Sequence, residues 1–200
     1  MASVLSNGGG FYSAAVYVQE SKRIGLEVKL PCINKSEYEY TGTGKELRIG
    51  LMAIKNLSRN SIERIIKERG ENGKYVSLAD FLIRTKLGYE ETALLIKCGS
   101  MHCFKVTRPT LLRLLDIYIN HRKILNENYN DLFMNDTFAL ERDVVTNINY
   151  SAEEICRNEY ESFSYMVTRH PLNFFSEWLN DVCIIKAKDM AAMTILIVKC

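Results

Sequence analysis

A short turn near residue 57 carries residue types that can bind a phosphate group. Asn56 and Ser58 are small polar residues that tolerate turn geometry or cap a helix, and the apolar Leu57 lies between them. We expect a sharp bend that buries Leu57 and leaves the amide N–H groups of the following helix pointing outward. Such donors, at the positive end of a helix dipole, hold an anion without reading a nucleic-acid base.

Basic side chains surround this turn. Between residues 45 and 69, seven lysines and arginines outnumber three glutamates, and this excess favours a polyanion as ligand. The residues that we expect to contact DNA are Lys55, Asn56, Leu57, Ser58, Arg59, Asn60 and Arg64. A plainer interpretation is the solvated face of an amphipathic helical pair, and this stretch alone does not decide between the two.

The stretch from residue 47 to residue 69 reads as two short helices joined by the turn. Apolar residues recur at helical spacing on both sides of it, at Leu47, Leu51, Ile54, Ile62, Ile65 and Ile66. Asn60 stands three residues before Glu63, which is the spacing of a capping box, so we expect the second helix to start there. This pattern is typical of a helix-hairpin-helix.

Capping and stop residues predict further helices along the chain. These helices cover residues 14–24, a segment from residue 78, and residues 90–98, 108–124, 152–167 and onward from 171. Apolar residues on either side of the turn at 41–44 predict a small β-hairpin. We therefore expect a mainly α fold, in which a tandem helix-hairpin-helix domain is joined by a small β-hairpin and additional C-terminal helices.

Composition fits a soluble globular protein. Of the 200 residues, 47% are hydrophobic and the formal net charge is +2. Because no run of 18 apolar residues occurs, we expect no membrane span. The six cysteines form no CxxC pair and follow no N-terminal signal, so we expect free thiols in a reducing cytoplasm.

Few residues are arranged for catalysis. Cys98, His102 and Cys103 are close enough in sequence to consider zinc, but no second ligand pair stands at a suitable distance, so we predict no metal site. His170 is a lone imidazole. The carboxylates lie mainly on expected helix surfaces or in a linker, and no GxxxxGK[ST] or GxSxG motif occurs. We expect no chemistry from this chain alone.

A segment rich in Asn and Asp, residues 126–149, shows little periodicity and predicts a linker. Within it, Asp131, Leu132 and Phe133 place an apolar pair behind an acid. This arrangement is typical of a peptide that docks into a pocket of another protein, or of a segment that folds back on its own chain.

Several short blocks, taken in order, resemble one known family. They are Gly10-Phe11-Tyr12-Ser13, Leu30-Pro31, Asn34-Lys35-Ser36, Leu47-Arg48-Ile49-Gly50-Leu51, Ile54-Lys55, Ser77-Leu78, Asp80-Phe81, Leu95-Ile96, Gly99 and His170-Pro171-Leu172. In this order and spacing the chain resembles the alpha subunit of bacterial DNA polymerase III, a C-family replicative polymerase, over nearly its whole length.

The resemblance implies a domain order for a piece of a longer chain. Residues 1–44 would be the end of the fingers domain and the β-hairpin, and 45–125 a tandem helix-hairpin-helix DNA-binding domain. Residues 126–150 would be a linker with a clamp-binding peptide at Asp131–Phe133, and 151–200 helices leading to a truncated OB domain.

The resemblance also implies partners and a role in DNA replication. The implied partners are primer-template duplex DNA, the sliding clamp and the rest of the polymerase chain. The palm carboxylates that hold magnesium in the parent polymerase lie upstream in the family, so the resemblance leaves open whether this chain is an enzyme.

Two departures from the family keep alternatives open. Asn56 and Ser58 replace the hairpin glycines of the family, which crowds a phosphate. Asn128 or Tyr129 replaces the leading Gln of the clamp peptide. One alternative is a protein-interaction scaffold that has lost DNA binding, and another is an independent helix-hairpin-helix DNA repair protein.

Overall fold

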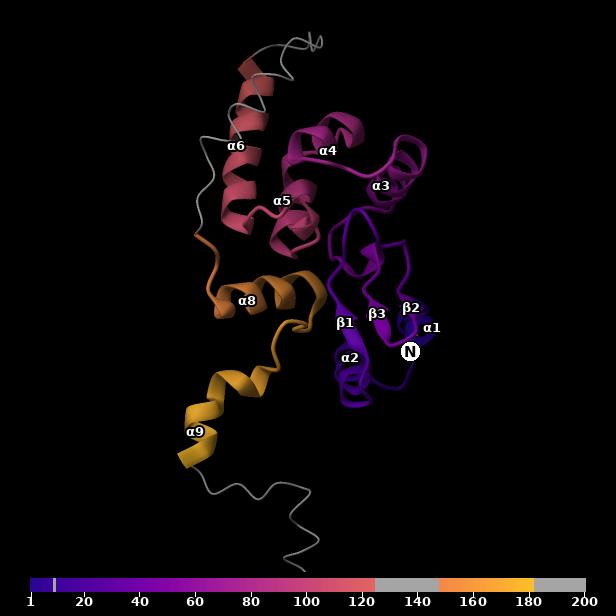
Figure 1. Ribbon diagram of the computed structural model, residues 1–200, viewed down its shortest axis with the longest axis vertical. Helices are drawn as coiled ribbons and strands as arrows, with labels where there is room; N and C mark the ends of the chain where they lie inside the picture. Colours follow the sequence, from indigo (N-terminus) through magenta and orange to yellow (C-terminus); the bar gives the residue numbers. More distant parts are fainter. Residues whose placement is uncertain (9, 125–147, 182–200) are drawn as a thin grey trace, which may run out of the picture. The chain divides into compact units, whose positions relative to one another are not determined.

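The computed structural model describes residues 1–8, 10–124 and 148–181, and it divides into two units, Met1–Thr168 and Arg169–Cys200. The fold is mainly α, as predicted, with one small sheet (Figure 1). The elements of the first unit are α1 (Ala2–Ser6), α2 (Ala14–Arg23), β1 (Glu27–Lys29), β2 (Thr41–Thr43), β3 (Glu46–Arg48), the 3-10 helix η1 (Leu51–Ala53), α3 (Arg59–Asn72), α4 (Leu78–Thr85), α5 (Tyr89–Lys97), η2 (His102–Phe104), α6 (Arg108–Ile124) and α8 (Ala152–Phe163).

The three strands follow the order β1-β3-β2. Strands β2 and β3 are antiparallel, with Gly42 opposite Leu47, so the predicted β-hairpin is confirmed. Its turn is tighter than expected, because Thr41–Thr43 is strand and Gly44 bends the chain with a φ of 59°. Strand β1 pairs in parallel with β3. Strand β1 was not predicted, because no local turn signal marks a parallel partner.

The helix expected from Leu47 to the bend is largely replaced by the second strand of the hairpin, which was expected to merge into it. Residues 46–48 form strand β3, and only Leu51–Ala53 coil, as the 3-10 helix η1. The amides of Leu51 and Met52 donate to the carbonyls of Glu37 and Tyr38, so they are not available for a helix. Gly50 lies so close to the Glu39 backbone that a Cβ there would be 2.3 Å from its carbonyl carbon. The spacing of the apolar residues therefore predicted correctly which side chains are buried, but it did not predict the backbone conformation.

Local capping signals place most other helix ends. The Ser77 Oγ accepts a hydrogen bond from the Asp80 amide at 3.1 Å at the start of α4. Ser151 and Glu154 form a complete capping box on α8. That helix stops at Phe163 and not near residue 167, because Ser164 adopts a left-handed conformation that ends it.

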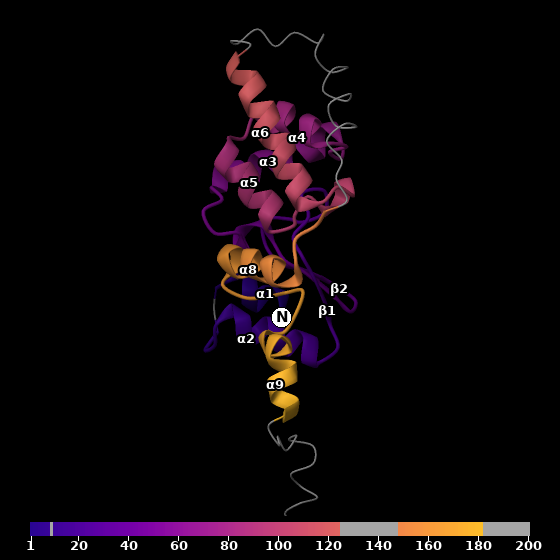
Figure 2. The same cartoon turned by 90° about the vertical axis from the view of Figure 1, so that its left-hand side faces the viewer.

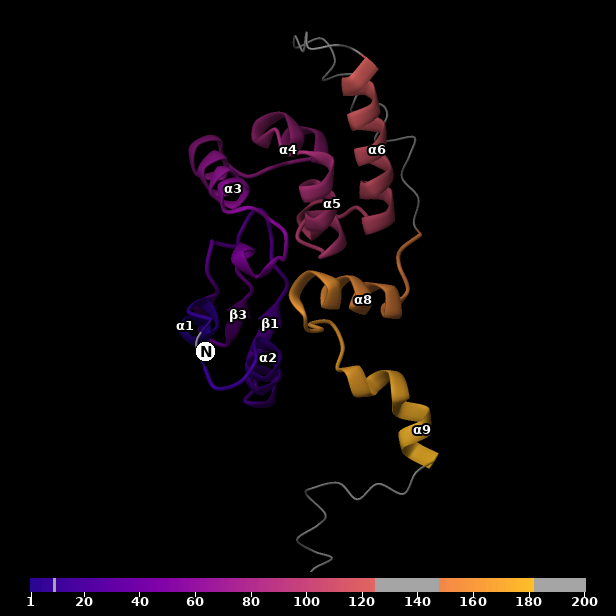
Figure 3. The ribbon, with the colours of Figure 1, turned by 180° about the vertical axis from the view of Figure 1, so that it is seen from behind.

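The hydrophobic core of the first unit joins the hairpins to the helices. Helix α5 packs against α6 and α8, and α3 packs against α4 and η1. Figure 2 shows α5 and α6 side by side, and Figure 3 shows α3, α4 and α5 following one another along the chain. Leu57 and Leu87, which lie between successive helices, are both part of this core. Their burial anchors the two connecting turns.

In the second unit, the described residues form the 3-10 helix η4 (Pro171–Phe175) and α9 (Ser176–Asp181). The predicted helix start at Pro171 is a 3-10 turn, and the His170 Nδ1 accepts the Leu172 amide at 3.2 Å. His170 thus caps a helix. Across all the described residues, no helix is long and apolar enough to span a membrane.

Candidate nucleic-acid interface

The first hairpin, residues 55–58, has the predicted sharp bend. Asn56 takes a left-handed conformation with a φ of 61°, and Leu57 is 8% exposed. Ser58, and not Asn60, is the N-cap of α3, because its Oγ accepts the Ser61 amide at 3.2 Å. The expected capping box of Asn60 and Glu63 is therefore wrong, since the helix already starts two residues earlier.

The main-chain donors of the first hairpin are only partly free. The Lys55 amide donates to the Ser162 carbonyl of α8 at 2.9 Å, and the Ser58 amide donates to the Glu91 carboxylate of α5 at 3.1 Å. Within the described part of the chain, no acceptor lies in reach of the amides of Asn56, Arg59 and Asn60. These three amides are available to a ligand, whereas those of Lys55, Leu57 and Ser58 already donate within the chain, the Leu57 amide to the Ile54 carbonyl at 3.4 Å.

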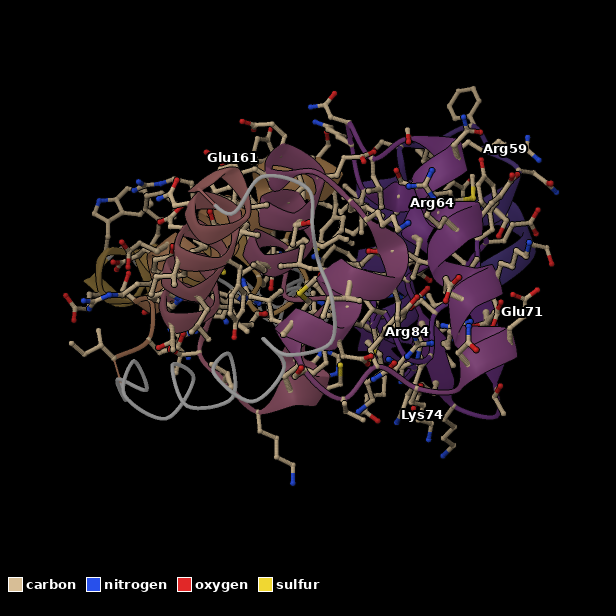
Figure 4. All side chains as sticks on the ribbon, turned by 90° about the horizontal axis from the view of Figure 1, so that it is seen from above. Arg59, Arg64, Glu71, Lys74, Arg84 and Glu161 are labelled. Atoms are coloured by element: carbon tan, nitrogen blue, oxygen red, sulfur yellow. The ribbon has the colours of Figure 1, made fainter. Side chains whose placement is uncertain are left out.

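The cations predicted around this hairpin differ in availability. Lys55 is exposed, and no acidic group among the described residues pairs with it. Arg59 is also exposed, but its Nε donates to Glu63 at 2.7 Å and its guanidinium lies 5.3 Å from the centre of the Tyr38 ring. The Arg64 Nη1 donates to the Thr85 carbonyl at 3.0 Å. Figure 4 shows Arg59 and Arg64 on the same helix, α3.

A second hairpin, residues 86–88, repeats the geometry of the first. Lys86 has a φ of 53°, as Asn56 has 61°, and Leu87 is buried as Leu57 is. Gly88 is the N-cap of α5 in an extended conformation, as Ser58 is of α3. Among the described residues, no acceptor reaches the amides of Gly88 or of the next two residues. This hairpin retains a glycine and presents three successive free donors.

This second hairpin was not among the residues predicted to contact DNA. A signal was present, because Lys86-Leu87-Gly88 repeats the polar-Leu-small pattern of Asn56-Leu57-Ser58 at an interval of 30 residues. Both turns therefore place a left-handed residue, a buried leucine and an N-cap in the same order. The pair of hairpins expected from the tandem pattern is thus visible as a structural repeat.

A groove of about 510 Å³ runs between α3 and the end of α4. Its lining contains four basic residues and two acidic ones, together with a threonine: Glu63, Arg64, Lys67, Glu68, Arg84, Thr85 and Lys86. The hydrogen bond from Arg64 to Thr85 crosses the same region. Basic residues therefore outnumber acidic ones in the groove, although Arg84 pairs there with Glu68.

Arg84 in this groove has a structural role. Its Nη2 donates to the carbonyls of Glu68 and Gly73 at 2.7 and 2.9 Å, and its guanidinium stacks 4.3 Å above the Tyr75 ring. These contacts tie the end of α3 to α4 (Figure 4). Lys86, in the second hairpin itself, is exposed and therefore accessible to a ligand.

The residues considered for zinc are separated in the fold. Cys98 is completely buried, which raises the pKa of its thiol to about 11, and its Sγ donates to the Leu95 carbonyl. Cys103 and His102 instead contact Cys32, and hydrogen bonds from them lower the pKa of the Cys32 thiol. Cys32 is wholly inaccessible to a substrate. Among the described residues, no group of three His, Cys, Asp or Glu side chains is placed to hold a metal.

Comparison with known proteins gives one consistent family. The helix-hairpin-helix motif family matches residues 25–111, which include both hairpins. The DNA polymerase III subunit alpha of Borreliella burgdorferi is 34% identical over 170 residues, and that of Buchnera aphidicola is 29% identical over 175. This chain is a relative of the DNA polymerase III alpha subunit. An error-prone DNA polymerase of Mycobacterium bovis is 35% identical over 105 residues, or 52% of the chain.

The similarity covers most of this chain but little of its relatives. It spans 78% and 82% of the chain in the first two relatives, and 15% of the length of each. The resemblance read from the short motifs is therefore confirmed. The four-part domain division at 44, 125 and 150 stays a prediction, and Asp131–Phe133 lies outside the described residues.

Proposed function

We propose that this chain binds the backbone of duplex DNA without base recognition, as a segment of a replicative DNA polymerase. The observation that carries the proposal is the structural repeat of the two hairpins, each with free helix-start donors and an exposed lysine. Amides at a helix start suit a phosphate oxygen, and they carry no sequence information. The names of the relatives, which are DNA polymerases, support the same ligand.

The proposed contacts divide the predicted residues into two groups. Lys55, Arg59 and Arg64 would supply positive charge, and the free amides and side chains of Asn56 and Asn60 would donate to a phosphate. Leu57 and Ser58 would act through the fold, because Leu57 anchors the bend in the core and Ser58 caps α3. The second hairpin would add Lys86 and the amides that follow it.

A salt titration tests this proposal. We expect the chain to bind labelled primer-template DNA with an affinity that falls steeply with salt, because each neutralised phosphate adds about 0.9 to the slope of log K against log salt. Replacing Lys55, Arg59 and Arg64 together should reduce both the affinity and the slope. Lys45→Gln, which removes one exposed charge at the β2–β3 turn, is the control for Lys55→Gln as a single variant. The proposal would be contradicted if the unaltered chain did not bind the DNA, or bound it with an affinity that does not depend on salt.

One observation favours a second candidate, an interaction scaffold. The Ser58 amide, which would otherwise face a phosphate, is already bonded to Glu91. If the chain serves mainly as a scaffold, a sliding clamp would bind through Asp131, Leu132 and Phe133. Clamp binding would then survive replacement of Lys55 and disappear with Phe133→Ala, as measured by surface plasmon resonance on immobilised clamp.

The remaining parts of the proposal concern the parent enzyme. Nucleotidyl transfer, and the magnesium that supports it, would belong to regions of the relatives that this chain does not match. The rest of the polymerase chain would be the permanent partner, and the cytoplasm the compartment. Primer extension by a polymerase that carries the hairpin variants would show whether the DNA contacts support synthesis.

A further inference from the structure

The two hairpins are joined by one side chain, Glu91. Its Oε1 accepts the Ser58 amide at 3.1 Å, and its Oε2 accepts the Ser61 hydroxyl at 2.7 Å. Ser61 and Glu91 occupy the same position in their helices, the third residue after the N-cap. Glu91, near the start of α5, thus contacts the start of α3.

A carboxylate at this point resembles a bound anion. It lies at the N-terminal end of α3, where the helix dipole and an amide donor favour negative charge. Partial burial opposes ionisation, but the hydrogen bonds from Ser61 and Ser58 outweigh it and lower the pKa of Glu91. Glu91 is therefore ionised at neutral pH and uses a donor that the first hairpin would otherwise present.

The neighbouring donors remain free. The amides of Asn56, Arg59 and Asn60 lack acceptors among the described residues. A phosphate that approaches them would meet the negative charge of Glu91 at the adjacent amide. Repulsion between like charges a few ångströms apart is substantial near a protein surface.

Resting on the DNA-binding function proposed above, we propose that Glu91 is an internal competitor that occupies the phosphate position of the first hairpin and restrains its affinity for DNA. The second hairpin has no such occupant among the described residues, since its Gly88 amide is free. DNA would engage the second hairpin first, and the first hairpin would bind fully only when Glu91 moves away. Glu91 is only partly buried, so its side chain has room to leave.

Three variants of the full 200-residue chain separate this role from a general charge effect. Glu91→Gln removes the charge and keeps the shape. Ser61→Ala removes one of the two hydrogen bonds that hold the carboxylate without changing the net charge. Glu161→Gln is the matched control, because Glu161 is exposed and precedes Ser162, whose carbonyl accepts the Lys55 amide (Figure 4).

The readout is binding of a labelled duplex at several salt concentrations, with circular dichroism to follow folding. We expect Glu91→Gln to bind about tenfold more tightly than Glu161→Gln, with a slope steeper by about 0.9, as for one added phosphate contact. Ser61→Ala should bind about threefold more tightly than the unaltered chain, because loss of one hydrogen bond loosens the competitor.

Two results would overturn the inference. Equal affinities of Glu91→Gln and Glu161→Gln would show only a general charge effect. Weaker binding or unfolding of Glu91→Gln, with Ser61→Ala unchanged, would show that Glu91 simply holds the hairpins together. Failure of the proposed DNA function looks different, because then the unaltered chain and all three variants would lack salt-dependent binding.

Discussion

The repeat of the two hairpins predicts that the exposed lysine of each, Lys55 or Lys86, contributes equally to the salt dependence of DNA binding. Lys55→Gln tests the first hairpin. Lys86→Asn tests the second, because asparagine tolerates the left-handed conformation at that position and mirrors Asn56. Both side chains are exposed, so neither change should disturb the core.

The magnitude follows from the number of cations. If Lys55, Arg59, Arg64 and Lys86 each neutralise one phosphate, the slope of log K against log salt is about −3.6. Between about 50 and about 200 mM salt, affinity then falls about 150-fold, and in the double variant, with a slope of about −1.8, it falls about 12-fold. For each single variant, the slope of log K against log salt should lie midway between these two values, at about −2.7.

Fluorescence anisotropy of a labelled duplex at four or more salt concentrations gives these slopes directly. Lys45→Gln is the control for loss of a surface charge elsewhere in the same unit. A slope for Lys86→Asn equal to that of the unaltered chain would refute the reasoning, because the second hairpin would then contact no phosphate despite its free amides.

Three further predictions concern stability and its dependence on pH. Leu87→Ala should lower the free energy of unfolding by about 2–5 kcal/mol in urea titrations, because it leaves a cavity under the second hairpin; a smaller change would show that Leu87 does not anchor this turn. The lowered pKa of Glu91 contributes stability that is present above pH 4.5 and lost as the pH falls through its folded value. The difference between the unaltered chain and Glu91→Gln in thermal melts should shrink on acidification and not on alkalinisation. Burial raises the pKa of Tyr75 to about 12, so this group lowers stability as the pH rises above 10, and Tyr75→Phe should weaken that pH dependence. The buried Tyr40 and Tyr165, whose pKa values are also raised, should maintain the rest of it.

Helix ends were predicted well where their chemistry is local. Ser77 with Asp80, Ser151 with Glu154, and Gly99 after α5 lie at the ends that the structure shows. Each signal involves residues within one helical turn, so the chain around it can be read without knowledge of the rest of the fold. The mainly α class and the small β-hairpin followed from the same kind of evidence.

The prediction failed where a distant segment competes for the backbone. The expected helix through Leu47 and Leu51 lost to β1 and to the carbonyls of Glu37 and Tyr38. The spacing of Leu47, Leu51 and Ile54 fitted a helix because all three side chains are buried, although the backbone around Leu47 is a strand. Strand pairing with a segment about 20 residues earlier leaves no local mark in a helical pattern.

The candidate site divides in the same way. The bend at Asn56, the buried Leu57 and the surrounding cations can be read from neighbouring residue types, because turn preference and charge are properties of the local sequence. Which amides remain available for a phosphate depends on Ser162 and Glu91, residues of other helices brought there by packing of the core. An amide that donates to a residue far away in the sequence is as unavailable to a ligand as one that donates to a neighbour. The number of donors that the first hairpin can offer to a phosphate is therefore decided only by the tertiary structure of the whole unit.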